Sequence, residues 1–145
     1  MGHKKTNKKE IQLQVGGCCL PPYFTKKCIS ILAALCHATD SQRVSILKSS
    51  DHNIIRCICE CTLNLLRGNI PIENNHLNKL KKYKNIIRNL VAEKNNNESE
   101  KNKKNKRKIN WLKKKKIVVQ QGSGAFLPLI LTPIVEILLA QLLKK

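Results

Sequence analysis

The chain has 145 residues and a formal net charge of +19, from 28 Lys and Arg residues against 9 Asp and Glu residues. That length allows one small domain with extensions. The sequence has no Gly-rich phosphate loop, no nucleophile with a suitable His and carboxylate, and no carboxylate pair in an apolar setting, so it predicts neither an enzyme nor a bound cofactor.

The first 93 residues predict a flexible lead followed by a small helical domain. Segment 1–24 is partly basic, and Pro21 and Pro22 close it. Segment 25–93 predicts three to four helices with little strand, an all-α fold. Thr25, Asp40 and Asp51 are the expected N-caps of the first three helices, and Gly68 is the expected stop of the third. The fourth helix is expected within 72–93.

Seven cysteines lie in the first 61 residues, and three of them alternate in the run CICEC, at Cys57, Cys59 and Cys61. Their odd number and the absence of a signal peptide predict a reducing compartment and free thiols. On a helix, Cys57 and Cys61 share a face that Cys59 does not. A zinc site lacks a clear return pair, since only Cys36, His37 and His52 are loosely placed nearby, so buried small side chains are the favoured interpretation.

Segment 94–116 predicts a Lys-rich disordered arm, because 94–108 contains no apolar residue that could offset chain entropy. Between positions 79 and 116 there are 16 basic and 3 acidic residues. Bound Lys and Arg release counterions condensed on phosphates, and aromatic residues are too few for base stacking, so we expect contacts with the backbone of double-stranded DNA. The basic clusters also suit nuclear localisation. The expected nucleic-acid contacts are Lys81, Lys82, Lys84, Arg88, Lys103, Lys104, Lys106, Arg107, Lys108, Lys113, Lys114, Lys115 and Lys116.

Segment 117–145 predicts an apolar C-terminal helix. From Ala125 to Leu143 only Thr132, Glu136 and Gln141 are not apolar or proline. The length just reaches that of a membrane span, but Pro128 and Pro133 would interrupt the helical hydrogen bonds. Spanning, interfacial insertion and packing against the helical domain or a partner are all open. The residues expected to contact a membrane or partner are Phe126, Leu127, Pro128, Leu129 and Ile130.

A resemblance appears where the basic segment meets this tail. The run GSGAFLPLILTPI at 122–134, preceded by lysines, resembles the C-terminal part of the precursors of adenovirus core protein mu. The longer stretch 57–133, with CICEC, LLRGNIP and LKKYK, is similar to short basic proteins of Polinton or Maverick transposons and adintoviruses. The chain differs from the mu precursors in using Lys in place of Arg, in having Gly-Ser-Gly-Ala at the junction, and in adding a Cys-bearing helical domain.

This resemblance implies a virion core protein that condenses double-stranded DNA in the virion core and the host nucleus. It also implies maturation by a viral cysteine protease. The run QQGSG at 120–124 fits such a site, with cleavage between Ser123 and Gly124, and QVGG at 14–17 is a second match. Capsid proteins are further expected partners. Two alternatives remain: a membrane-active or membrane-anchored basic protein that uses the apolar tail, and a helical interaction protein whose tail binds a capsid or scaffold partner.

Overall fold

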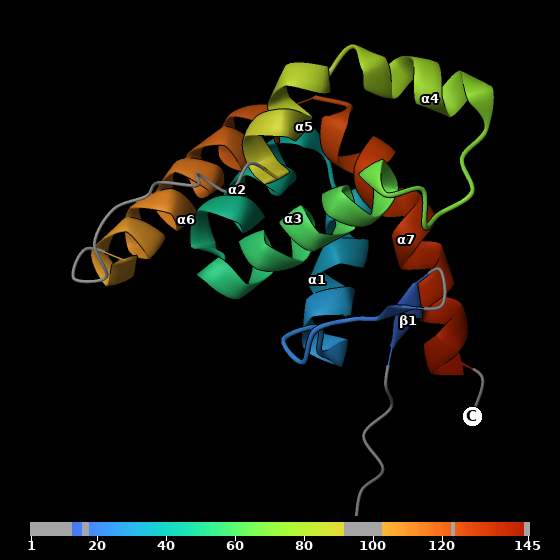
Figure 1. Ribbon diagram of the computed structural model, residues 1–145, viewed down its shortest axis with the longest axis horizontal. Coiled ribbons are helices and arrows are strands. Elements are labelled where there is room, and N and C mark those ends of the chain that lie inside the picture. The colour runs from blue at the N-terminus through green and yellow to red at the C-terminus, as the bar shows by residue number, and fades with distance from the viewer. Residues whose placement is uncertain (1–12, 16–17, 92–102, 123, 144–145) are drawn as a thin grey trace, which may run out of the picture.

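The computed structural model describes residues 13–15, 18–91, 103–122 and 124–143 (Figure 1). As predicted, the fold is all-α, with one short hairpin before the first helix. The hairpin pairs β1 (Gln14–Val15) with antiparallel β2 (Cys18–Cys19). The helices are α1 (Lys26–His37), α2 (Asp40–Ser49), α3 (His52–Leu66), α4 (Asn74–Lys81), α5 (Lys84–Val91), α6 (Lys103–Gln121) and α7 (Phe126–Leu143).

Side-chain caps begin α1 and α3 where the sequence predicts them. The Thr25 hydroxyl accepts a hydrogen bond from the Cys28 N–H at 3.2 Å. The Asp51 carboxylate accepts bonds from two N–H groups in the first turn of α3. Such bonds satisfy donors that the helix itself leaves without partners. Gly68 follows α3 with φ of +73°, a conformation that glycine adopts without a Cβ clash, so the predicted stop is confirmed as well.

The N-cap predicted for α2 is wrong by one residue. Thr39 occupies the cap, and its hydroxyl accepts from the Gln42 N–H at 3.3 Å while the Gln42 side chain accepts from the Thr39 N–H at 2.9 Å. This reciprocal pair is a capping box, which satisfies two donors at once. Asp40 is instead the first helical residue, and its carboxylate pairs with Arg43.

The helix expected within 72–93 is two helices, α4 and α5. The chain turns at Lys82 and Tyr83, where the Tyr83 N–H bonds to the Leu80 carbonyl at 2.9 Å. The Tyr83 ring packs against Phe126 of α7, with ring centroids 5.2 Å apart. The break lets α4 pack on α7 while α5 packs on α3 and α6 (Figure 1). One straight helix could not contact both sets of neighbours.

The disordered arm predicted for 94–116 is wrong from Lys103 onward, because α6 begins there. Its second half carries apolar residues that dock on the body, with Val118 fully buried and Trp111 and Ile117 partly buried. α6 packs against α2, α3 and α5. Lysine is a good helix former, so a helix fixed at its C-terminal half can extend through the lysines that precede it. Residues 94–102 lie outside the described part of the chain.

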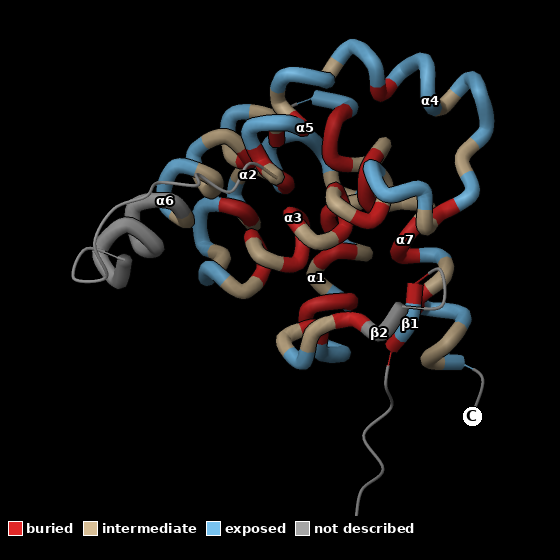
Figure 2. The backbone as a smooth tube through the Cα atoms, in the orientation of Figure 1, coloured by how far each residue is buried: buried red, intermediate tan, exposed pale blue. Residues whose placement is uncertain are grey.

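The apolar tail is part of the helical core, not a segment separate from the 25–93 domain. α7 packs against α1, α3, α4 and β1, and buried positions run along α1, α3 and α7 in Figure 2. Its expected helical state is confirmed. Of the open alternatives, packing into the helical domain is the arrangement seen in the structure. The buried residues of α7 are Phe126, Leu127, Ile130, Leu131, Ile134, Val135 and Leu138.

The two prolines do not break α7. Pro128 lies in the first turn, where the helix has no partner for a backbone N–H. Pro133 removes the donor that the Leu129 carbonyl would otherwise bond within the helix. His76 of α4 compensates, because its Nε2 lies 2.6 Å from the Leu129 carbonyl oxygen. The sequence showed the missing donor but not the side chain from another helix that replaces it.

The end of the N-terminal segment 1–24 is also part of the fold, although this segment was expected to be flexible. Leu13 and Val15 are buried, and Gln14 lies on β1. The Gln141 side-chain amide of α7 accepts from the Gln14 N–H at 3.0 Å and donates to its carbonyl. This amide pairs with β1 much as a neighbouring strand would, so it joins the start of the described chain to the end of α7. The predicted cleavage match at 14–17 ends at Gly16 and Gly17, which lie outside the described residues.

Candidate nucleic-acid interface

Four predicted DNA contacts lie at the junction of α4 and α5. Lys81 ends α4, Lys82 follows it, and Lys84 and Arg88 lie on α5. All four are exposed. The apolar side chains Ile87 and Leu90 on α5 are buried, so the helix is amphipathic and its charged residues remain free to meet a ligand.

The run Lys113 to Lys116 on α6 divides by environment. Lys113 and Lys116 are exposed, whereas Lys114 and Lys115 are partly buried. The Lys114 ammonium lies 5.1 Å from the centroid of the Trp111 ring. These four lysines therefore do not form one equivalent cluster.

Lys115 has a structural role that the sequence did not indicate. Its ammonium donates to the Lys48 carbonyl at 3.1 Å and to the Ser50 carbonyl at 2.7 Å. These carbonyls lie at the C-terminal end of α2, where cations interact favourably with the helix dipole. Lys115 thus joins α6 to α2 and is a weaker candidate for phosphate contact than its exposed neighbours.

We name the exposed predicted cations of the α4–α6 region the basic surface: Lys81, Lys82, Lys84, Arg88, Lys113 and Lys116. α5 packs directly against α6, so the two sets of charges lie on adjacent helices (Figure 1). The predicted contacts Lys103, Lys104, Lys106, Arg107 and Lys108 lie on the first half of α6, and their side chains are outside the described part.

Acidic residues do not neutralise these helices locally. α4, α5 and α6 contain no Asp or Glu. Within the described ranges, acidic side chains occur only at Asp40, Asp51, Glu60, Glu73 and Glu136. Three helices with cations alone, two of which pack together, produce a positive potential that attracts polyanions and raises their association rate.

An aromatic and cationic stack holds α6 against α3. The Arg56 guanidinium of α3 lies 4.2 Å from the Tyr23 ring centroid and 5.7 Å from that of Trp111. Each such contact contributes about 0.5 to 2 kcal/mol. The scarcity of aromatic residues gave no hint of this arrangement, because Tyr23 and Trp111 meet only through the tertiary fold.

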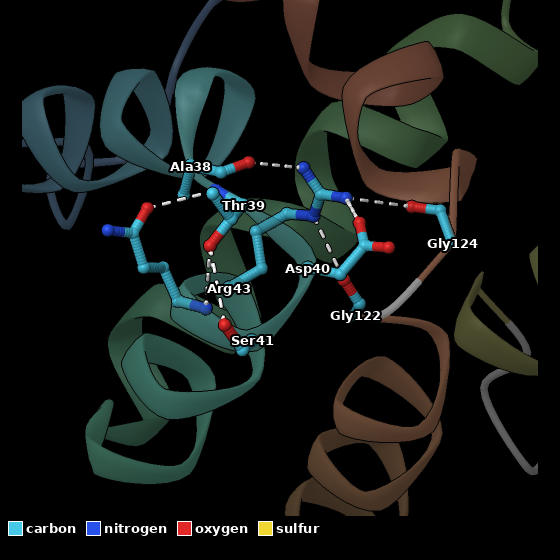
Figure 3. Close-up of polar contacts among 8 residues, drawn as sticks. Ala38, Thr39, Asp40, Ser41, Arg43, Gly122 and Gly124 are labelled. Atoms are coloured by element: carbon cyan, nitrogen blue, oxygen red, sulfur yellow. Dashed lines mark hydrogen bonds and ion pairs between the residues drawn. The ribbon is translucent and has the colours of Figure 1, made fainter.

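Arg43 organises the joint between α6 and α7, which contains the predicted cleavage site (Figure 3). Only 7% of this residue is exposed. Its guanidinium donates to the carbonyls of Gly122 at 2.9 Å, Ala38 at 2.7 Å and Gly124 at 3.4 Å, and it pairs with the Asp40 carboxylate. One side chain therefore joins the end of α1, the start of α2 and the α6–α7 joint.

Packing explains the first glycine of this joint. A Cβ on Gly122 would lie 3.0 Å from the Leu47 side chain and 3.3 Å from that of Val44, so a larger residue would force these side chains of α2 to shift. In the predicted cleavage sequence, Gln120 and Gln121 are helical, Gly122 is buried, Gly124 is exposed, and Ser123 lies outside the described residues. The sequence on the N-terminal side of the predicted cut is therefore not displayed as an extended strand.

The alternating cysteines are buried, as predicted, because α3 is covered on two sides. Cys57 and Cys61 are at most 1% exposed and Cys59 is 9% exposed. Burial raises the pKa of the Cys59 thiol to about 11, and the Lys114 ammonium of α6 opposes that rise. Burial also raises the pKa of Cys57 and Cys61 above the ordinary value. In the described ranges, no group of three His, Cys, Asp or Glu side chains is arranged to hold a metal ion.

The residues predicted to contact a membrane or partner have mixed exposure. Phe126, Leu127 and Ile130 are buried, whereas Pro128 and Leu129 are partly exposed. The latter two line an open cleft of about 610 Å³. By length and composition alone α7 could cross a membrane, with a mean hydropathy of 2.1. The other residues that line the cleft are Asp40, Arg43, His76, Gly124, Ala125 and Thr132.

Comparison with protein-family models, curated proteins and solved structures finds no match to this chain.

Proposed function

We propose that this protein binds the phosphate backbone of double-stranded DNA through its basic surface and acts as a DNA-condensing core protein of a virus or virus-derived element. The observation that carries the proposal is that α4, α5 and α6 display lysines and arginine and contain no acidic residue, and that α5 and α6 pack side by side. The resemblance of segment 122–134 to mu precursors supports the viral setting.

The expected interaction depends on charge and not on base sequence. Lysine binds phosphate as a point charge, without the two-pronged geometry of arginine. Of the six residues in the basic surface only Arg88 has a guanidinium, so these side chains favour backbone contact over recognition of base edges. Such binding suits packaging, in which the ligand has no fixed sequence.

Maturation by a viral cysteine protease between Ser123 and Gly124 belongs to the same proposal. Because Gln121 is helical and the Gly122 carbonyl is bound by Arg43, cleavage requires local opening of the joint. We therefore expect cleavage of the free protein to be slow, and faster in a variant that lacks the Arg43 contacts.

Membrane binding is the second candidate, and the length and hydropathy of α7 favour it. Two features of the fold oppose it. The apolar side chains of α7 fill the core. In addition, Pro133 has no N–H to donate to the Leu129 carbonyl, and this carbonyl accepts a hydrogen bond from His76 instead. Insertion of α7 would expose the core of the remaining helices and leave that carbonyl without its partner in lipid.

The test uses the full-length protein, because removal of α7 would remove the core. Binding to a random-sequence duplex is titrated across salt, with vesicles of anionic and neutral lipid as competitors. We expect log K to fall by about 0.9 per phosphate contact for each tenfold rise in salt. Weak duplex binding with a shallow salt slope, together with salt-resistant binding to vesicles, would overturn the proposal in favour of the membrane function.

A further inference from the structure

Two thiols from different helices converge on one backbone oxygen. The Cys28 Sγ of α1 lies 3.3 Å from the Tyr23 carbonyl oxygen, and the Cys57 Sγ of α3 lies 3.8 Å from the same oxygen. Both S–H groups are directed to that acceptor, and the two thiols are near enough to interact electrostatically. Burial raises the pKa of Cys57, and the neighbouring Cys28 thiol raises it further.

Cys59 and Cys36 have different surroundings. Cys59 lies on the opposite side of α3 from Cys57, near Lys114 of α6. Burial raises the pKa of the Cys36 thiol, and the Thr132 side chain of α7 opposes that rise. The sulfurs of Cys28 and Cys57 are thus distinguished by a shared acceptor between two packed helices.

We propose that Cys28 and Cys57 form a reversible disulfide that cross-links α1 to α3 when the protein meets a peroxide. In the first step one thiolate attacks a peroxide oxygen, the O–O bond breaks, and a sulfenic acid and water are formed. The second thiol then attacks the sulfenic sulfur, which forms the S–S bond and releases a second water. Overall, two thiols lose two electrons and two protons to one hydrogen peroxide molecule.

Burial sets the conditions of this reaction. Cys28 is 6% exposed and Cys57 is fully buried, so a small uncharged oxidant reaches them during local opening. The thiolate is the reactive form, and the raised pKa of Cys57 keeps that thiol protonated at neutral pH. Attack by Cys57 is therefore slow near pH 7, and the reaction accelerates as the pH rises and more thiolate forms.

The bond also has consequences outside the core. It removes both S–H donors from the Tyr23 carbonyl. The Tyr23 ring faces Arg56, which also faces Trp111 on α6. Trp111 is the one tryptophan of the chain, so its fluorescence reports changes in the contacts among Tyr23, Arg56 and Trp111 without a label.

The experiment treats folded full-length protein with limiting hydrogen peroxide at several pH values. Intact mass and non-reducing peptide mapping then identify any bond. We expect a Cys28–Cys57 link, loss of two hydrogen atoms, a rise in Tm of several degrees from the restricted unfolded chain, a shift in Trp111 emission, and reversal by dithiothreitol. Cys28→Ser and Cys57→Ser should each abolish the product, and Cys36→Ser should retain it.

The wild-type peptide map makes this test independent of whether the serine variants fold. The absence of any cross-link in folded protein at alkaline pH would overturn the proposal. A bond between Cys36 and Cys61, or to Cys18 or Cys19, in place of the Cys28–Cys57 bond would overturn it equally.

Discussion

Helices α6 and α7 are neighbours in the chain with opposite compositions. α6 carries nine basic residues and no acid, and α7 is almost entirely apolar. α7 is fixed by a continuous buried face that meets α1, α3 and α4. α6 is fixed by a few contacts near its C-terminal half, among them buried Val118 and the bonds of Lys115. The same fold therefore obtains stability from one helix and a charged surface from the next.

This difference predicts that substitutions in the two helices have separable effects. Changes on the buried face of α7 should lower the free energy of unfolding and alter DNA binding only through the fold. Changes at exposed lysines of α6 should do the reverse. Arg43 lies between the helices and should affect both.

The largest effect is expected at Phe126, which is fully buried and packs on Tyr83. Phe126→Ala should lower the free energy of unfolding by about 3 to 5 kcal/mol, because it leaves a cavity in the core. Urea denaturation followed by circular dichroism measures the change. Leu139→Ala, at a position 39% exposed on the same helix, should cost less than about 1 kcal/mol. Equal costs would mean that α7 does not have the buried face described.

The joint is the next most sensitive region. Arg43→Met should cost about 2 to 3 kcal/mol, because the carbonyl of buried Gly122 loses its donor and the other acceptors of Arg43 lose theirs as well. The variant should also speed proteolysis at the joint in limited-digestion assays. Lys48→Met serves as the control, since it removes a cation from an exposed site. Unchanged proteolysis in Arg43→Met would show that the guanidinium does not hold the joint closed.

His76 tests how α7 accommodates its internal proline. His76→Ala should cost about 1 to 2 kcal/mol, because the Leu129 carbonyl loses its donor. Pro133→Ala restores an N–H within α7, so the cost of His76→Ala should fall by about 1 kcal/mol in that background. A thermodynamic double-mutant cycle measures this coupling. If His76→Ala has the same cost in both backgrounds, the compensation is absent.

The smallest effects distinguish Lys113 from Lys115, which lie two positions apart on α6. Lys115→Met should cost about 0.5 to 1 kcal/mol of stability, through lost bonds to the end of α2. Lys113→Met should leave stability unchanged within about 0.5 kcal/mol and reduce the salt slope of DNA binding by about 0.9. If Lys115→Met reduces that slope as much as Lys113→Met, Lys115 also contacts phosphate.

Local signals in the sequence predicted the all-α class, the caps Thr25 and Asp51, the stop at Gly68 and the buried cysteines. These features depend on short-range bonds or on helical periodicity. The helical arm, the packing of α7 into the core and the break at Tyr83 could not be predicted in this way, because they depend on contacts between distant segments. Arg43 is the clearest example: its acceptors at Gly122 and Gly124 lie about 80 positions away in the chain.

For the candidate site, the sequence indicated which segments are basic but not which cations remain exposed. It could not show that Lys115 would bond to α2 or that Lys114 would lie beside Trp111. The sequence also predicted a disordered arm for the run Lys113 to Lys116, in which all four side chains would be equivalent. A helix divides them by face, and this division reduces the candidate phosphate contacts to the exposed positions.

The most direct test of the central claim compares two variants of equal net charge in duplex DNA binding across salt. One replaces Lys84, Arg88, Lys113 and Lys116 of the basic surface with Gln. The other replaces four exposed cations elsewhere with Gln, at Lys26, Lys27, Lys48 and Arg67. We predict that the first variant reduces the salt slope by roughly 3 to 4 and that the second changes it little. Equal reductions in both would contradict the account, because net charge and not the α5–α6 surface would then determine binding.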